Sequence, residues 1–437
     1  MVHRLRETIY RCPDCGDLLD VVYPRPTFDI EKIKTRWRNR RASPLPIDAS
    51  GVWRFRELLP FYDTLDQLVT YPEGNTPLLD APRSAKYAGV RRLRFKHLGL
   101  NPTGSFKDYG MATGVTQARL LGMRAVACAS TGNTSASMAA YAARAGLAAI
   151  VLVPELGVSF AKLSQSLDYG ALTLQVRGDF DEAQALLQRL APQLGIYILN
   201  SVNPFRLEGQ KSVMIELMEQ LGWRAPDRIV VPGGNLGNSG SYGKALRELD
   251  DLGLLSKRPR ITIVQARGAA PLYEAFSGGH EEKLVRVHAR TLATAIKIGS
   301  PVSWKKARRA VHWSDGWVTS VEEQDIADAK AVIGTDGIGC EPASATTLGA
   351  LRRLTLEGTD QRIDPDEDVV GILTGNVLKD PDYTLRYHQG ELYEEFTTET
   401  TITNKGQALV SNHANPPIVV DPTIDALTAA IASRLTF

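Results

Sequence analysis

The sequence predicts an α/β protein built on mostly parallel sheet. Short apolar segments that end at glycine, asparagine or serine alternate with longer segments of helical spacing, which is typical of βαβ units. The chain has 437 residues, of which 43% are hydrophobic and 23% are charged, an ordinary globular composition with length for two or three domains. We find no short-period repeat that would indicate a solenoid instead.

Composition excludes several classes of protein. The net charge of +2 indicates no nucleic-acid partner. The absence of an 18-residue apolar run predicts no transmembrane helix and no membrane partner. The first ten residues carry Arg4, Arg6 and Glu7, so they lack the apolar core of a signal peptide. Four cysteines are too few for a disulfide framework in so long a chain, and we expect a cytoplasmic protein.

Residues 1–72 are expected to form a ribbon-like segment followed by an arm. Cys12 and Cys15 in a C-x-x-C-G turn look like half of a zinc ribbon. Tetrahedral zinc needs four ligands, and the next cysteines are Cys128 and Cys340, far along the chain. We therefore expect a tight turn with free thiols and predict no metal, keeping Cys12 and Cys15 only as a weak half-site. Zinc shared with His3 or between subunits is a weaker alternative.

The arm at 24–72 is punctuated by prolines and is expected to be irregular. Its basic run at 32–41 is interpreted as a solvated helix face or a linker. Apolar side chains then follow that we expect to clamp the arm onto the main body: Trp53, Phe55, Leu58, Leu59, Phe61 and Tyr62.

The elements of the main body, 73–385, follow in order. Strand 91–97 alternates basic and apolar residues, as a strand with two unlike faces would. Further strands are predicted at 125–129, 149–153, 172–176, 196–199, 229–231, 261–265 and 369–373, with helices at 111–121, 136–145, 159–169, from 179 and from about 206. Residues 386–437 are expected to be a C-terminal extension whose amphipathic stretch, 424–435, packs on the core.

Lys107 lies at the predicted junction between a strand and a helix, after the turn residues Asn101, Pro102 and Gly104. Open α/β sheets bind their ligands at such points. Lysine is unfavourable at a helix N-terminus because the dipole there favours anions. A lysine near positive charge and apolar groups loses its proton more easily and can form a Schiff base. This segment by itself favours the alternative, a solvated residue of the first turn.

Residues 233–238 form the clearest predicted anion cradle. A strand, a glycine-rich turn and a helix start direct several backbone N–H groups at one point. The segment lacks the G-x-G-x-x-G spacing of a dinucleotide site and the lysine of a P-loop, so a single phosphate fits better.

Three further strand ends carry polar residues. Residues 130–137 are rich in hydroxyl groups and suit a carboxylate, the alternative being N-capping by Ser130 or Thr131. Asn200 and Ser201 with Arg206 suit a second phosphate, a weak signal when taken alone. Thr374 could form one hydrogen bond with a ring nitrogen, or could simply belong to a turn.

A parallel sheet brings these strand ends to one crevice. The crevice would then hold an amine, two anion sites, a carboxylate loop and a lone hydroxyl. That set suits pyridoxal phosphate together with an amino-acid substrate.

Several ordered motifs resemble the threonine synthase family, over about residues 70–385. The matching segments are 101–108 (NPTGSFKD), 130–137 (STGNTSAS), 200–211 (NSVNPFRLEGQK), 234–238 (GNLGN), 295–304 (AIKIGSPVSW), 341–345 (EPASA) and 374–381 (TGNVLKDP). The resemblance implies pyridoxal-phosphate fold type II: two open, mostly parallel sheets with flanking helices, the smaller subdomain at about 110–205, plus the small N-terminal ribbon-like segment. It also implies a homodimer.

The resemblance further implies a reaction and roles for single residues. O-phospho-L-homoserine and water would give L-threonine and phosphate, with Lys107 holding the cofactor and moving protons. The cofactor would also be bound by Asn133, Gly234, Asn235, Leu236, Gly237, Asn238 and Thr374. The substrate would be bound by Ser130, Thr131, Thr134, Asn200, Ser201 and Arg206.

One departure and three alternatives stay open. Many members of the family have arginine after the Lys-Asp pair, where this chain has Tyr109. A sibling such as threonine dehydratase or cysteate synthase is the nearest alternative. A binding or regulatory protein that lost catalysis is disfavoured by the intact Lys107, Asn133 and Thr374. A nucleotide-binding Rossmann protein is disfavoured by the missing glycine fingerprint.

Overall fold

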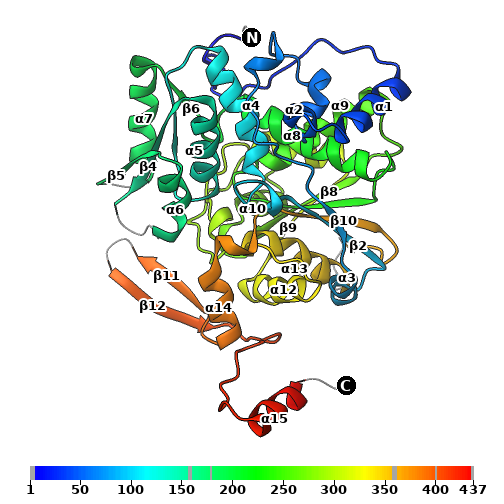
Figure 1. The fold of residues 1–437 in the computed structure, drawn as a ribbon, viewed down its shortest axis with the longest axis vertical. Coiled ribbons are helices and arrows are strands. Elements are labelled where there is room, and N and C mark those ends of the chain that lie inside the picture. The colour runs from blue at the N-terminus through cyan, green and yellow to red at the C-terminus, as the bar shows by residue number, and fades with distance from the viewer. Residues whose placement is uncertain (1–4, 156–159, 178–179, 357–361, 399–400, 435–437) are drawn as a thin grey trace.

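The computed structural model describes residues 5–155, 160–177, 180–356, 362–398 and 401–434, which form two large sheets with helices packed around them and one two-stranded hairpin (Figure 1). The predicted helix starts at Ser159 and Asp179 lie outside the described residues. The predicted fold class, α/β with two mostly parallel sheets, is confirmed.

The larger sheet has six strands in the order β1-β2-β10-β7-β8-β9, and only the β1–β2 pair is antiparallel. The smaller sheet has four parallel strands in the order β5-β4-β3-β6. The larger sheet consists of β1 (Leu78–Asp80), β2 (Arg92–His97), β10 (Asp368–Leu373), β7 (Arg228–Pro232), β8 (Arg260–Ala266) and β9 (Trp317–Val321), and the smaller one of β5 (Leu172–Val176), β4 (Ala148–Pro154), β3 (Ala125–Ala129) and β6 (Ile196–Ile198).

Helices cover both faces of these sheets, so strands such as β3 and β7 are buried at every position. The prediction that 91–97 has two unlike faces is wrong: β2 is buried from Leu93 to His97, because Arg94 pairs with Asp368 and Lys96 lies in an internal ion cluster. The short edge strands β1 and β9 were not predicted.

The helices of the main body begin closer to the strand ends than the sequence indicates. The helix expected from 111 begins at Lys107 and the one expected from 136 begins at Asn133, so both polar residues lie in first helical turns. The helices are α3 (Pro82–Ala88), α4 (Lys107–Leu120), α5 (Asn133–Ala145), α6 (Phe160–Asp168), α7 (Phe180–Leu194), α8 (Pro204–Gln220), α9 (Gly237–Asp251), α10 (Pro271–Ser277), α11 (Trp304–Trp313), α12 (Glu323–Thr335), α13 (Pro342–Leu356) and α14 (Pro381–Gln389).

The N-terminal arm is more regular than expected. The basic run belongs to α1 (Ile30–Arg41), which begins at the capping residue Asp29; the short α2 (Pro46–Ala49) and the 3₁₀ helix η1 (Trp53–Leu58) follow. Basic residues dominate the sequence of α1, and only two of its residues, Ile33 and Trp37, are buried. Two apolar positions are too few to reveal the helix from its sequence pattern. The expected clamp residues are buried in the core, except Tyr62, which is half-buried.

Trp37 is the main anchor of α1. It is fully buried, its ring centroid lies 5.3 Å from that of Phe55, and its Nε1 donates to Glu57 over 3.0 Å. We expect Trp37→Ala to lower the free energy of unfolding by about 3–5 kcal/mol, because it leaves a large cavity in the core. Urea unfolding measures this, with the exposed Arg38→Ala as control. Equal stability of the two variants would contradict an anchoring role.

The segment around Cys12 and Cys15 forms a tight turn, in which Gly16 N donates to Cys12 O over 2.9 Å, flanked by a bridge between Arg11 and Leu18. Both thiols are free. Within the described ranges, no group of three or more histidine, cysteine, aspartate or glutamate side chains is arranged to hold a metal ion.

The C-terminal extension packs on the core only in part. Tyr387 of α14, Leu392 and Leu409 are buried, and Leu392 and Leu409 flank a hairpin of β11 (Tyr393–Thr398) and β12 (Thr401–Ala408). The final helix, α15 (Ile424–Arg434), has no buried residue and stands apart from the body (Figure 1), so the prediction that 424–435 packs on the core is wrong. Of the helices the structure describes, none is long and apolar enough to cross a membrane.

Candidate active site

The loops after β3, β6, β7 and β10 open into one pocket of 1320 Å³, larger than the usual 300–1,000 Å³ of ligand pockets and therefore roomy enough for a cofactor and a substrate. All fourteen residues predicted for the site line it. They are Lys107, Ser130, Thr131, Asn133, Thr134, Asn200, Ser201, Arg206, Gly234, Asn235, Leu236, Gly237, Asn238 and Thr374.

Lys107 is the first residue of α4, and the loop before it is fixed to the end of β10. Phe106 N donates to Thr374 O over 2.9 Å, and Ser105 forms a bridge with Gly375. The Lys107 side chain lies in the pocket, with Nζ 4.1 Å from the centroid of the Phe106 ring, rather than on a solvated face. Burial, helped by the positive charge of Arg206 and opposed by Glu341, lowers the pKa of Lys107 to about 7. A sizeable fraction of this amine is neutral near pH 7 and can act as a nucleophile.

The neighbouring Asp108 points away from the pocket and holds the loop in place. Its carboxylate accepts hydrogen bonds from Thr103 N at 2.8 Å and from Thr103 Oγ1 and Ser137 Oγ at 2.5 Å each. Burial raises the pKa of Asp108 to about 6 in spite of these donors. Because Ser137 belongs to α5, this carboxylate ties the Lys107 loop to the helix that begins at Asn133.

The glycine-rich turn after β7 forms a concave backbone. Leu236 adopts a left-handed conformation, φ 63°, and α9 begins at Gly237, so the first N–H groups of the helix have no partner within it. A Cβ on Gly234 would lie 3.1 Å from Ile296 Cα, so the turn lies close against that segment. Asn235 Oδ1 accepts from Val302 N over 2.9 Å, which fixes the turn from outside. This arrangement suits a phosphate group.

The hydroxyl-rich loop after β3 leads into α5. The residue that caps α5 is Gly132, which makes no side-chain capping bond, so the alternative that Ser130 or Thr131 is the N-cap is wrong. Ser130 N donates to Leu152 O over 3.1 Å, which joins the loop to β4. The hydroxyl groups of Ser130, Thr131 and Thr134 thus border the pocket beside a helix N-terminus.

The loop after β6 contributes a buried cation. Arg206 lies in the first turn of α8, where Nη1 donates to Leu199 O over 2.8 Å and Nε is buried without a hydrogen-bond partner among the described residues. Burial lowers the pKa of Arg206 to about 10. Asn200 also stabilises the end of β3. Its Oδ1 accepts a hydrogen bond from Ala129 N over 3.2 Å, and its Nδ2 donates to Ala129 O over 3.0 Å. Arg206 therefore has more N–H groups left to bind a ligand than Asn200 has.

Glu341, a residue to which the sequence assigned no role, joins two predicted site residues. It is buried just before α13, and accepts from Thr374 Oγ1 and from Asn133 Nδ2, each over 2.8 Å. A Cβ on Gly375 would lie 2.3 Å from Glu341 Cδ, so only glycine fits there. Burial raises the pKa of Glu341. The segment 341–345 was singled out from the sequence, but only the fold reveals the contacts of its glutamate.

Three more cations line the pocket and were not predicted for it: Arg286, Lys297 and Lys379. Lys379 Nζ bonds to Gln165 Oε1 of α6 in the smaller sheet unit. The sequence signal for Lys379 as a pocket residue was its position, five residues after Thr374.

The pocket fits pyridoxal phosphate. Lys107 offers an amine of lowered pKa, the backbone at 234–238 is shaped for one phosphate with a glycine where a side chain would crowd Ile296, and Thr374 offers an uncharged hydroxyl. These are the three groups that the aldehyde, the phosphate and the ring nitrogen of this cofactor require.

Comparison with known proteins agrees with this fit. The family model of pyridoxal-phosphate dependent enzymes matches residues 69–375. Threonine synthase of Methanocaldococcus jannaschii is 44% identical over 381 residues, which cover 87% of this chain and 91% of that protein. Threonine synthase of Methanosarcina acetivorans is 42% identical and covers 98% of this chain and 96% of its own length. Maize serine racemase has a similar fold, with a TM-score of 0.58 and 21% identity over 70% of this chain and 90% of its own. The chain therefore belongs to the family of pyridoxal-phosphate dependent enzymes, within its threonine synthases.

Proposed function

We propose that this protein converts O-phospho-L-homoserine and water into L-threonine and phosphate. One observation carries the proposal: the pocket has a buried guanidinium, that of Arg206, which is suited to a second anion in addition to the backbone cradle at 234–238. Arg206 and Ser201 line the pocket with Lys107, and the Nε of Arg206 has no hydrogen-bond partner among the described residues. A substrate that itself carries a phosphate group needs such a site, whereas deamination of threonine does not. The names of the relatives support the same reaction.

The residues that would hold the cofactor are Lys107 at its aldehyde, the N–H groups of 234–238 at its phosphate, Asn133 at its phenolic oxygen and Thr374 at its ring nitrogen. When bound, pyridoxal phosphate supplies a sink for the electrons that are released as C–H bonds of the substrate break. The hydroxyl of Thr374 cannot protonate the ring as a carboxylic acid would. It therefore favours elimination and replacement over transamination.

The substrate carboxylate would be bound by Ser130, Thr131 and Thr134, and its phosphate by Arg206 with Ser201 and the remaining N–H of Asn200. The amine of Lys107, freed by the substrate, removes one proton from Cα and one from Cβ. The Cγ–O bond breaks and phosphate leaves with the bonding electrons. Lys107 then returns protons to Cγ and Cα, while water adds its oxygen at Cβ and gives one proton to the departed phosphate. The atoms sum to threonine and inorganic phosphate.

The first experiment measures release of phosphate from O-phosphohomoserine and identifies the organic product by chromatography. Threonine and phosphate in equal amounts are expected. Visible absorbance of bound cofactor without phosphate release would favour a threonine dehydratase, which is then assayed by ammonia release from threonine. Formation of cysteate from phosphoserine and sulfite would favour cysteate synthase.

The low pKa of Lys107 gives a pH prediction. Apoprotein is expected to take up pyridoxal phosphate at a rate that rises with pH through about 7 and is level above pH 8, since only the neutral amine attacks an aldehyde. Glu341 favours the charged amine, so Glu341→Gln is expected to move this midpoint to lower pH. Stopped-flow absorbance measures the uptake. A rate that rises only above pH 9, as for an exposed lysine, would contradict the assignment.

The homodimer implied by the resemblance and the cytoplasmic location expected from the composition are also proposals. Analytical ultracentrifugation of the holoenzyme tests the first, where a sedimenting species of one chain would reject it. Cell fractionation tests the second.

A further inference from the structure

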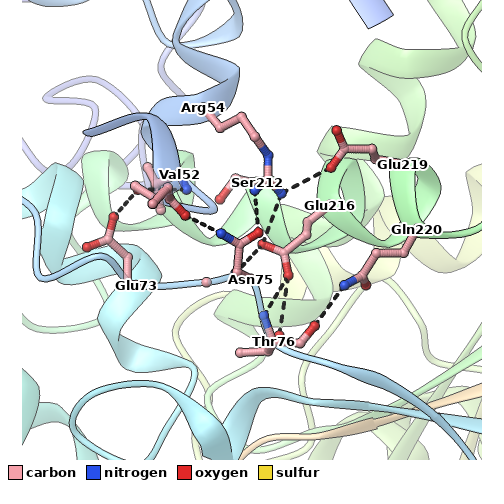
Figure 2. Close-up of polar contacts among 12 residues, drawn as sticks. Val52, Arg54, Glu73, Asn75, Thr76, Ser212, Glu216, Glu219 and Gln220 are labelled. Atoms are coloured by element: carbon pink, nitrogen blue, oxygen red, sulfur yellow. Dashed lines mark hydrogen bonds and ion pairs between the residues drawn. The ribbon is translucent and has the colours of Figure 1, made fainter. Parts of the chain in front are cut away.

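A buried carboxylate, Glu216, lies at the centre of a polar cluster (Figure 2) whose residues do not line the pocket. It belongs to α8, the helix that carries Arg206 at its other end. Its oxygens accept hydrogen bonds from Asn75 N at 2.9 Å and Thr76 N at 3.0 Å. The ammonium group of Lys96, from β2, bonds to the same carboxylate. Glu216 thus gathers donors from segments that are far apart in the sequence.

The N-terminal arm adds a second cation to this cluster. Arg54 of η1 is fully buried, and its Nη2 lies 3.1 Å from Glu219 Oε2 and 3.7 Å from Glu216 Oε2. Its Nη1 donates to Asn75 Oδ1. Figure 2 shows the guanidinium reaching from the arm toward both carboxylates of α8. Two glutamates are thereby balanced by Arg54 and Lys96, and loss of one cation would leave a buried negative charge without compensation.

The helix that carries Lys107 also contacts Glu216. Tyr109, two residues after Lys107 on α4, places its hydroxyl 3.3 Å from Glu216 Oε1 and 3.2 Å from Thr76 Oγ1. The two helices touch along their backbones, since a Cβ on Gly209 would lie 2.0 Å from Tyr109 O and one on Gly110 would lie 2.9 Å from Arg206 O. Any shift of α8 against α4 therefore moves Arg206 against Lys107.

We propose that Arg54 is a positioning residue for the active site: through Glu216, the N-terminal arm fixes the register between α4 and α8 and so the relative placement of Lys107 and Arg206. The inference rests on the proposed function, but its deciding measurement, cofactor uptake by the apoprotein, does not require the substrate. The same arrangement accounts for the contacts of Tyr109, since α4 faces Glu216 with a neutral phenol while the guanidinium comes from the arm.

The test uses cofactor uptake by the apoprotein of the full chain as a function of pH. The midpoint of this profile reports the surroundings of Lys107, which faces Arg206 from α8 and Glu341 from the segment before α13, and is followed by Asp108. Arg54→Met removes the charge with little change in volume. We expect the midpoint to rise by about one pH unit or more, because a relaxed helix pair hydrates Lys107 and moves Arg206 away. We expect kcat/KM to fall about tenfold or more, mainly through kcat.

A matched control and a rescue make the test specific. Arg56 lies in the same η1 and pairs with Asp48 at 2.7 Å, wholly within the arm, so Arg56→Met is expected to lower the unfolding temperature while leaving the uptake midpoint in place. The double variant Arg54→Met/Tyr109→Arg supplies a guanidinium to Glu216 from α4 and is expected to return the midpoint toward the wild-type value.

An unchanged midpoint in folded Arg54→Met would overturn the proposal, as would equal midpoints in the Arg54 and Arg56 variants. Should Arg54→Met not fold, Tyr109→Phe removes the Glu216 contact of α4 without unbalancing charge. A rise of its midpoint supports the proposal, and an unchanged midpoint overturns it. Failure of the proposed reaction would appear separately, as wild-type protein that takes up cofactor normally and releases no phosphate.

Discussion

Replacing Lys107 with alanine is expected to lower threonine formation by at least about 10⁴-fold, because one amine both holds the cofactor and carries every proton transfer of the proposed reaction. The fold should be retained, since the side chain of Lys107 is only half-buried and makes no hydrogen bond to the rest of the described chain that would be lost. Phosphate release, threonine chromatography and the visible absorbance of bound cofactor are recorded on the same samples.

Lys86→Ala, an exposed lysine of α3, is the matched control and should keep full activity. Loss of both threonine formation and the cofactor absorbance in Lys107→Ala alone would assign cofactor, lysine and reaction together. Turnover within about tenfold of wild type would contradict the central role of Lys107, since general acid–base catalysis alone accounts for more than that.

Arg206→Met is expected to reduce kcat/KM for O-phosphohomoserine by about 10³-fold, mostly through KM. A guanidinium that makes two charge-assisted hydrogen bonds to phosphate contributes about 4 kcal/mol, which corresponds to this factor. Cofactor absorbance should persist, because the cradle at 234–238 belongs to a different loop. Arg206 also supports Leu199 O, so the variant is checked for folding by circular dichroism.

The same variant separates the candidate functions. If the enzyme were a threonine dehydratase, ammonia release from threonine would be measurable in wild type and nearly unaffected by Arg206→Met. The exposed Arg38→Met serves as the control for loss of an arginine charge. An unchanged KM for O-phosphohomoserine in Arg206→Met would reject this residue as the phosphate site and leave Lys379 or Arg286, which also line the pocket, to be tested next.

Local sequence was sufficient for the elements that form the pocket. Apolar segments followed by turn residues placed the buried strands β3 and β10 at or within one residue of their observed bounds, because a short buried strand consists of consecutive apolar residues. The more exposed β5 was also predicted at its observed bounds. The loops after β3, β6, β7 and β10 could be identified for the same reason, since their polar residues follow immediately. Parallel topology then required them to converge.

The pairing of buried charges depends on contacts between segments that are far apart in the sequence. Glu341 meets Asn133 across 208 residues, and Arg54 reaches Glu216 from the arm. Periodicity carries no signal for such pairs, because a buried charge looks like a solvated one until its partner is known. For the same reason β2 was expected to have an open polar face. The amphipathic pattern of α15 predicted a buried apolar face, but the helix has no buried residue in the structure. The sequence by itself determined the order in which strands, loops and helices follow one another along the main body, and the residue types at the crevice. Only the tertiary structure decided which buried charges are paired and which helices these pairs hold together, because pairing depends on distances in space.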